Sequence, residues 1–190
     1  MTTNEMRIIT ERLILRGIRI SDAEAMFKYR SDPQIYRFQG WKPQTLEDVK
    51  AFINEKIAKV PNIPYTWYQL GILLKGTDEL IGDVGIHFID SDNLQVEIGY
   101  TLSLQHQSKG YATEAIIGLI NYLFNGLKKH RIIASVDPRN VKSIALLERI
   151  YMRKEAHFKK SFWVDNEWAD DVVYAILKEE WTNQNEKSRL

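Results

Sequence analysis

The chain has 190 residues, of which 44% are hydrophobic and 27% charged, the composition of an ordinary globular domain. Its 26 Lys and Arg residues balance 25 Asp and Glu residues, so we expect neither nucleic acid nor a membrane as a partner, because both favour a basic excess. The chain has no cysteine, which excludes disulfides, thiolate metal sites and a cysteine nucleophile. These features predict a cytoplasmic protein with one domain over residues 1–182 and a polar C-terminal tail over residues 183–190.

The first third of the chain predicts a strand and two helices. Apolar and β-branched residues predict a strand over residues 8–16. Ser21, with Glu24 three residues later, has the spacing of a capping box and predicts the start of the first helix. Apolar residues three and four apart predict a second helix over residues 45–60, which ends before Pro61.

Three strands joined by short turns follow, over residues 68–74, 80–89 and 94–104, and predict an antiparallel meander. The third strand has the most regular alternation of apolar and polar residues. One of its faces is therefore expected to be buried and the other to be available for chemistry. The available face carries Gln95, Glu97, Gly99, Thr101 and Ser103.

The remaining segments predict two helices and three strands. A stripe of apolar residues predicts the longest helix, over residues 112–127, and a further helix is expected over residues 140–150. Strands are expected over residues 132–136, near 155–162 and over 172–177. Strands and helices are mixed along the chain, which predicts an α+β fold with about four helices.

The segment Gln107-Ser108-Lys109-Gly110-Tyr111-Ala112 lies between a predicted strand and the start of the longest helix. Free backbone N–H groups and the helix dipole make such a position suitable for a phosphate. Gly110 and Ala112 leave room for a phosphate against the backbone, and Gly110 also permits a positive φ. The segment lacks the Gly-Lys-Ser/Thr ending of a Walker loop and the three glycines of a dinucleotide fingerprint. On this pattern alone, an ordinary turn remains the alternative.

The pattern Gln107-x-x-Gly110-x-Ala112 resembles the Gln/Arg-x-x-Gly-x-Gly/Ala signature of the GNAT N-acetyltransferases. The run from Gly110 to Ala115 resembles the form found in the ribosomal-protein N-acetyltransferase branch of that superfamily. Order and spacing are similar to that branch over nearly the whole chain, in the segments Thr10–Arg16, Glu97–Tyr100, Asn140 with Ser143, Trp168 with Asp170, and Glu180-Trp181.

Two positions depart from the pattern of that family. Ser108 stands where glycine is most frequent, and Tyr151-Met152 stands where Gly-Phe is usual after the helix over residues 140–150. The first departure leaves Gly110 intact. The second affects the exit from the helix, although methionine can still fill a core position.

The resemblance implies the GNAT fold, in which a central, mostly antiparallel twisted sheet is splayed at the coenzyme site, and it implies acetyl-CoA as co-substrate. It places the pyrophosphate on the backbone amides from Gln107 to Ala112. The implied coenzyme contacts are Leu102, Leu104, Gln107, Ser108, Lys109, Gly110, Tyr111, Ala112, Thr113, Asn140 and Ser143. A solvated surface charge is the alternative role for Lys109. No metal is expected, because the four histidines lack metal-ligand spacing.

Acyl transfer to an amine requires a base for the amine, a donor to the carbonyl oxygen and a way to accommodate the leaving thiolate. The position of Glu97 resembles that of the base in histone-type GNAT enzymes; a structural salt bridge and a base that acts through water are the alternatives. The backbone N–H of Thr101 or Leu102 is the implied oxyanion donor. Ser143 is the implied group for the sulfur, because Leu147 stands where many relatives have a tyrosine.

The sequence says least about the acceptor. The resemblance implies that Tyr36, Phe38 and Trp41 wall the acceptor pocket, together with a late hairpin around Phe162 and Trp168; packing or a homodimer surface is the alternative role for these aromatic residues. The predicted function is transfer of an acetyl group to a primary amine, with a protein N-terminus as the leading acceptor. The alternatives are a small amine, such as a polyamine or an aminoglycoside, and a non-catalytic acyl-CoA-binding module.

Overall fold

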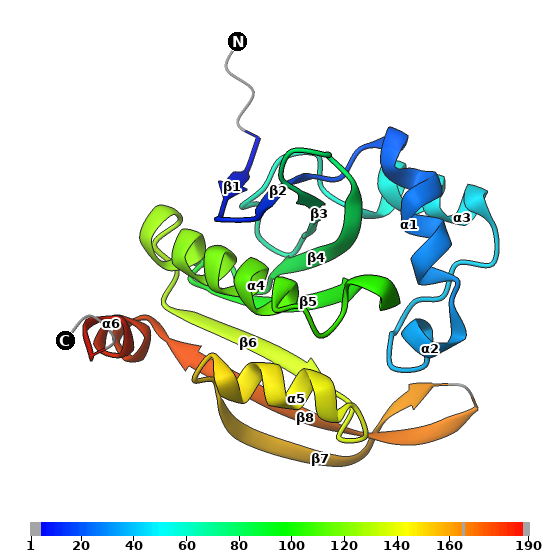
Figure 1. Ribbon diagram of the computed structural model, residues 1–190. Helices are drawn as coiled ribbons and strands as arrows, with labels where there is room; N and C mark the ends of the chain where they lie inside the picture. The colour runs from blue at the N-terminus through cyan, green and yellow to red at the C-terminus, as the bar shows by residue number, and fades with distance from the viewer. Residues whose placement is uncertain (1–4, 165, 188–190) are drawn as a thin grey trace.

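The computed structural model describes residues 5–164 and 166–187 of the chain. Its strands form an eight-stranded sheet in the order β1-β2-β3-β4-β5-β6-β8-β7 (Figure 1). Neighbouring strands are antiparallel except for β5 and β6, which pair in parallel. The strands are β1 (Arg7–Ile9), β2 (Leu13–Gly17), β3 (Trp67–Leu74), β4 (Leu80–Phe88), β5 (Gln95–Leu102), β6 (Arg131–Val136), β7 (Arg153–Val164) and β8 (Glu167–Leu177).

Helices cover both faces of this sheet. Successive residues of a strand point to opposite faces, so Asp83 and Val84 of β4 identify the two faces. Asp83 is hydrogen-bonded to Arg30 of the first α-helix. Val84, on the opposite face, belongs to the main apolar core, which also contains residues of the fourth α-helix. The α-helices are α1 (Ala23–Arg30), α2 (Pro33–Tyr36), α3 (Leu46–Ala51), α4 (Tyr111–Asn121), α5 (Val141–Arg149) and α6 (Lys178–Lys187). No helix within the described residues is long and apolar enough to cross a bilayer.

Helix α4 carries the apolar stripe that the sequence predicts. Ala115, Ile116, Leu119 and Ile120 are fully buried and share one core with the apolar face of β5. The helix continues into a π-helical turn over residues 122–126, which completes the predicted helical segment. Burial of this stripe holds the N-terminus of α4 beside the end of β5, where the candidate site lies.

The single strand predicted over residues 8–16 is wrong, because this segment forms the hairpin of β1 and β2. The chain turns after Ile9: the Thr10 N–H donates to the Leu13 carbonyl (3.0 Å), and the Leu13 N–H donates to the Thr10 hydroxyl (3.0 Å). Apolar β-branched residues lie on both sides of this turn, so the composition of the segment does not reveal it. The turn directs Arg12 toward the start of α4.

The predicted limits of the first two helices also require correction. Helix α1 has Asp22 rather than Ser21 as its N-cap, and the Asp22 carboxylate accepts from the Arg19 N–H (2.8 Å). Helix α3 begins after Thr45 as predicted, but its helical segment ends in a π-turn at Lys56. Val60, the predicted last residue, lies beyond this turn and is exposed.

The C-terminal third confirms the predicted elements and extends several of them. Helix α5 starts after Asn140, whose side-chain oxygen accepts from the Ser143 N–H (3.2 Å). Strands β7 and β8 form a hairpin in which β7 is longer than predicted at both ends and β8 begins earlier than predicted, at Glu167. Residues 183–187 of the predicted tail belong to α6, and residues 188–190 lie outside the described residues.

Strands β5 and β6 separate in the middle of the sheet. Their parallel register ends at the pair Glu97 and Ile133, and the strands diverge beyond it (Figure 1). Along β5, successive N–H groups point to opposite neighbours. The Ser103 N–H donates toward β4, to the Ile81 carbonyl (2.9 Å), so alternation turns the N–H groups of Ile98, Tyr100 and Leu102 toward the gap. The predicted splayed, mostly antiparallel sheet is confirmed.

A buried ion pair fixes α1 on the sheet. Asp83 is fully buried and accepts hydrogen bonds from Tyr29, Arg30 and Gln69. The Arg30 guanidinium also lies over the Trp41 ring, 5.4 Å from its centroid. Removal of one charge would leave the other buried and unpaired, at a cost of about 3–5 kcal/mol. The network therefore anchors the segment that follows α1 and borders the candidate site.

The two positions that depart from the glycines of the resembling family adopt left-handed backbone conformations. Ser108 has a φ of 61° and Tyr151 a φ of 64°. Tyr151 follows α5 in a Schellman arrangement: its N–H donates to the Glu148 carbonyl (3.0 Å), and the Met152 N–H donates to the Leu147 carbonyl (3.0 Å). A Cβ atom is strained in this conformation, which explains why glycine suits both positions.

Replacement of Tyr151 with glycine is expected to stabilise the fold. Glycine adopts the left-handed conformation without strain, and the gain of roughly 1 kcal/mol would raise Tm by about 2–4 °C in a domain of this size. Thermal unfolding followed by circular dichroism measures the change. Tyr151→Ala keeps Cβ and is the matched control; an equal gain in both variants would contradict the explanation.

Candidate active site

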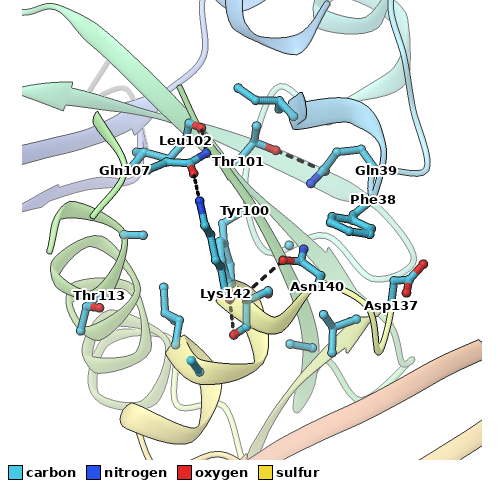
Figure 2. A pocket seen from close by; sticks show the side chains of 18 of the residues that line it. Phe38, Gln39, Tyr100, Thr101, Leu102, Gln107, Thr113, Asp137, Asn140 and Lys142 are labelled. Atoms are coloured by element: carbon cyan, nitrogen blue, oxygen red, sulfur yellow. Dashed lines mark hydrogen bonds between the residues drawn. The ribbon is translucent and has the colours of Figure 1, made fainter. Parts of the chain in front are cut away.

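A pocket of about 530 Å³ opens where β5 and β6 separate. Its walls are β5 from Ile98 to Leu102, the end of β6, the loop and first turn of α4, one side of α5, and residues 34, 35 and 37–40. Figure 2 shows Gln39 directed toward Thr101 and Lys142 directed toward Gln107, across the interior of this pocket. The pocket therefore joins elements from both faces of the sheet through the gap between the strands.

The start of α4 forms an anion cradle at one end of the pocket. Gly110 is the N-cap, with a φ of 81°, and it has no side chain to cap the helix. The N–H groups of Tyr111, Ala112 and Thr113 therefore have no partner within the helix and remain available for an external acceptor. With the helix dipole, this geometry suits a phosphate or pyrophosphate.

Side chains on both sides of the cradle hold it in place. The Gln107 amide donates to the Leu102 carbonyl (3.0 Å) and its oxygen accepts from the Lys142 ammonium (3.3 Å). The Arg149 guanidinium donates to the Thr113 hydroxyl (3.2 Å). Because Lys142 and Arg149 are two helical turns apart, they lie on the same face of α5. This face adds two positive charges beside the cradle.

Glu114 links the first turn of α4 to the turn between β1 and β2. Its carboxylate accepts from the Thr10 hydroxyl (2.6 Å), the Arg12 N–H (2.7 Å) and the Arg12 guanidinium (2.6 Å). Burial raises the pKa of Glu114, but these hydrogen bonds outweigh burial and hold the pKa below its usual range. Arg12 in turn donates to the Lys109 carbonyl (3.1 Å). The ionised Glu114 thus fixes the loop that forms the cradle.

A pair of hydroxyl groups lies in the gap between β5 and α5. The Tyr100 and Ser143 oxygens are 2.8 Å apart, and either group can donate. Burial raises the pKa of Tyr100 to about 12, although the hydrogen bond with Ser143 lowers it. The phenol is therefore protonated at neutral pH. It is a proton donor at the point where the cradle leads into the gap.

Most of the predicted site residues lie together. Those that line the pocket are Phe38, Thr101, Leu102, Leu104, Gln107, Ser108, Gly110, Tyr111, Ala112, Thr113, Asn140 and Ser143. Lys109 does not line it and contributes its carbonyl to Arg12 instead. The fold thus brings most residues that were predicted to contact the sulfur and the coenzyme into one pocket.

Three other predicted residues lie outside the pocket lining. Trp41 stacks on Phe52 with ring centroids 4.4 Å apart, in a small core beneath α1 and α3. Tyr36 lies under the Lys42 ammonium, 5.2 Å from the ring centroid. Glu97 lies at the vertex where β5 and β6 part, one residue before the lining begins.

Sequence reasoning missed Tyr100, Gln39, Asp137, Lys142 and Arg149, all of which line the pocket. Tyr100 was placed in the apolar stripe of β5, although its buried hydroxyl needs a partner, and that need was the available signal. The spacing of seven residues between the two basic residues of α5 was a second signal. Asp137 and Gln39 lie in irregular segments, where no local pattern indicates orientation.

Within the described part of the chain, no three His, Asp or Glu side chains gather closely enough to hold a metal ion. An anion cradle that leads into a gap with unpaired strand N–H groups suits a long co-substrate with phosphates at one end and amides along its length. These features place the protein among the acyl-CoA-dependent transferases. The chain belongs to the GNAT acetyltransferase family: the family described as "Acetyltransferase (GNAT) domain" matches residues 12–153. Members of this family use acetyl-CoA as co-substrate.

Relatives of known sequence and structure share nearly the whole chain. The uncharacterized N-acetyltransferase YnaD of Bacillus subtilis is 36% identical over 176 residues, which cover 93% of this chain and 99% of that protein. The ribosomal protein uS5-alanine N-acetyltransferase of Escherichia coli is 24% identical over 184 residues, or 94% of each chain. The crystal structure of a GNAT-family acetyltransferase from Bacillus anthracis has a TM-score of 0.83 and 35% identity, and covers 92% of this chain and 100% of that one.

A bulky side chain at Gly110 is expected to abolish acetyl-CoA binding. In Gly110→Trp a Cβ atom is strained at a φ of 81° and lies 3.3 Å from the Arg12 guanidinium, so the loop that presents the amides would be displaced. A loss of about 3 kcal/mol corresponds to more than 100-fold in Kd. Calorimetric titration with acetyl-CoA measures the loss. Lys109→Trp, one residue away and outside the pocket lining, is the matched control and should bind normally. Gly110→Ala serves if the tryptophan variant does not fold, and normal binding by a folded Gly110→Trp would contradict the cradle.

Proposed function

We propose that the protein transfers the acetyl group of acetyl-CoA directly to the N-terminal amine of a protein. The observation that carries this proposal is the continuous pocket through the gap between β5 and β6. Its cradle at the start of α4 provides for the coenzyme, and its other end, at residues 34, 35 and 37–40, provides for an acceptor. The thioester would lie between these ends, beside Tyr100 and Ser143.

The unpaired edge of β5 supports the position of the coenzyme. The pantetheine arm contains amide groups, and the N–H groups of β5 that face the gap need acceptors. Of the two predicted oxyanion donors, Leu102 has its N–H directed to the gap, whereas alternation directs the Thr101 N–H to β4. We therefore assign the thioester carbonyl to the Leu102 N–H. The Gln107 amide holds the same residue by its carbonyl (3.0 Å).

The leaving sulfur receives its proton from the Tyr100 and Ser143 pair. When the amine nitrogen forms its bond to the carbonyl carbon, the carbon–sulfur bond breaks and the sulfur becomes negative. Ser143 donates a proton to the sulfur. The Tyr100 hydroxyl, 2.8 Å from the Ser143 hydroxyl, then returns a proton to Ser143 or donates to the sulfur itself. Tyr100 thus takes the role that the sequence pattern leaves open when Leu147 stands at the usual tyrosine position.

Glu97 acts as a base through a water molecule. It lies two residues before Gly99 on the same face of β5, which corresponds to roughly 6.6 Å along the strand. Glu97 lies outside the pocket lining, which suits a contact through one bridging water rather than a direct one. The Glu97 carboxylate also lies 3.7 Å from the His87 imidazole, its cross-strand partner on β4.

The charge of the pocket favours an N-terminal amine over a polyamine. Among the described residues of its lining, Asp137 is the only acidic side chain, against Arg37, Lys142 and Arg149. Burial raises the pKa of Asp137, but hydrogen bonds from Arg139 outweigh it and keep the carboxylate ionised and engaged. Lys142 and Arg149 lie beside the cradle, where coenzyme phosphates would compensate them, and Arg37 is the charged lining residue at the acceptor end. A polycation would meet that positive charge with several of its own, whereas an N-terminus brings one charge. The Escherichia coli relative is named for acetylation of an alanine of ribosomal protein uS5, and this activity on a protein supports the same choice.

An alanine-initiated tetrapeptide is expected to be a better acceptor than spermidine. Each unmatched charge costs about 1 kcal/mol in a solvated site, so kcat/KM for the peptide should exceed that for spermidine by about 10-fold or more. Thiol release from acetyl-CoA measures both rates, and the same peptide with a blocked N-terminus is the control. Faster transfer to spermidine would indicate a small-amine enzyme. Coenzyme binding without transfer to any amine would indicate a non-catalytic module.

Loss of the Tyr100 hydroxyl is expected to slow transfer without weakening coenzyme binding. Tyr100→Phe should lower kcat by about 10–100-fold, because a proton donor contributes about 10²-fold or more to such a step. Since the pKa of Tyr100 is raised to about 12, its phenol stays protonated and should add no basic limb to the pH profile below pH 11. Tyr122→Phe, on the π-turn after α4, is the control. An unchanged kcat would assign the proton to Ser143 alone.

A further inference from the structure

Four glycines lie within the central strands β3, β4 and β5, and three of them are required by close neighbours. A Cβ atom added at Gly71 would lie 2.7 Å from a leucine methyl, at Gly82 2.3 Å from a backbone oxygen, and at Gly85 3.1 Å from an indole carbon. Gly99 is different, because an added Cβ would meet nothing within 4 Å. Its φ is not positive either. Neither packing nor backbone conformation explains the glycine.

Glycine in a strand interior has a cost. It weakens the strand by roughly 0.5–1 kcal/mol relative to alanine, and a glycine without a packing reason indicates close approach of a ligand or another backbone. Gly99 lines the pocket and is exposed. The open space above it therefore belongs to the pocket on the sheet face that carries α1.

Polar and aromatic groups lie near this open space on the same face of the sheet. One of these groups is the indole of Trp67, which lies over Gly85, the cross-strand partner of Gly99. The indole is held by stacking on the His87 ring, with centroids 4.6 Å apart and an angle of 7° between planes. Glu97 precedes Gly99 by one pleat on the same face.

Thr101 and Gln39 lie at one end of this open space. The Thr101 hydroxyl donates to the Gln39 side-chain oxygen (3.2 Å), which ties β5 to the segment after α1 (Figure 2). The recess thus has Gly99 as its floor and the hydroxyl–amide pair at one end, and the indole of Trp67 and the carboxylate of Glu97 lie beyond the lining on the same sheet face. The recess opens into the gap, toward Leu102 and the Tyr100 and Ser143 pair.

We propose that the reactive amine of the acceptor binds over Gly99, and that the missing side chain at this position sets the size of acceptor that the enzyme accepts. A primary ammonium group fits the chemistry of the recess, because a carboxylate and an aromatic ring both attract a cation. The carbon that bears the amine lies against the indole of Trp67. This inference rests on the proposed acetyl transfer and adds the place and the size limit of the acceptor.

The test is to fill the recess while the coenzyme path stays unchanged. Valine has a higher strand propensity than glycine, and a Cβ atom at position 99 meets no atom within 4 Å, so Gly99→Val should fold and unfold at an equal or higher temperature. Its kcat/KM for the alanine-initiated tetrapeptide should fall by about 100-fold, because misplacement of a reactant by 1 Å costs about that factor. Gly99→Ala should show a smaller loss, and spermidine as acceptor should show the same order of losses.

Calorimetry with acetyl-CoA provides the second readout, and Kd should stay within about twofold of the wild type in both variants. Gly126→Ala, where Cβ makes only ordinary contacts of 3.6 Å with the Tyr122 ring, is the matched control far from the recess. Unchanged acceptor kinetics in Gly99→Val would overturn the inference and leave the acetyltransferase function standing. Equal losses of acetyl-CoA binding and acceptor kinetics would also overturn it, by placing Gly99 on the coenzyme path. A wild type that acetylates neither amine would instead contradict the proposed function.

Discussion

The separation of β5 and β6 after Glu97 and Ile133 is the constraint on which the rest of the structure depends. Buried backbone N–H and C=O groups need partners, so a broken ladder inside a sheet is unstable unless other groups supply them. β6 compensates by pairing with β8 as far as Val136. The gap-facing edge of β5 keeps its donors available, beside the uncapped start of α4. The site is therefore a consequence of sheet geometry, and loops complete it.

Side-chain contacts replace the missing ladder around the gap. Glu114 joins α4 to the turn before β2, and Gln107 joins the end of β5 to Lys142 of α5. These contacts connect segments that lie about 100 and 35 residues apart in the chain. They also explain why the short run around Arg12 accompanies the glycine-bearing loop in the sequence pattern. The two segments form one structural unit, since Glu114 binds Arg12 and Arg12 binds the loop backbone.

Local patterns predicted the elements whose burial they encode. The stripe of α4 and the alternation of β5 are each repeated over several residues, and burial of one face follows directly from them. Trp41 shows the limit of such patterns. An aromatic residue in an irregular segment suits a pocket wall or a core, and its place in the core beneath α1 depends on Arg30 and Asp83. Tyr100 could not be assigned to the site from the pattern, because its aromatic ring fits the apolar stripe of β5 and only its hydroxyl contacts a site residue, Ser143.

The glycine positions of the chain, and the two where another residue replaces glycine, differ in what requires a glycine: the backbone conformation or the space for a ligand. Ser108 and Tyr151 adopt left-handed conformations without glycine, so the turns at these positions tolerate strain. The shape of the turn at Ser108 must be kept, because it orients the N–H groups of the cradle. Gly99 has the reverse character: its backbone is ordinary and the space above it is empty. Backbone strain is tolerated at positions where only the path of the chain matters. A side chain is not tolerated at a position where a bound molecule needs the space. The same residue type thus has a structural meaning at Gly110, where φ is positive and the helix begins, and a steric one at Gly99.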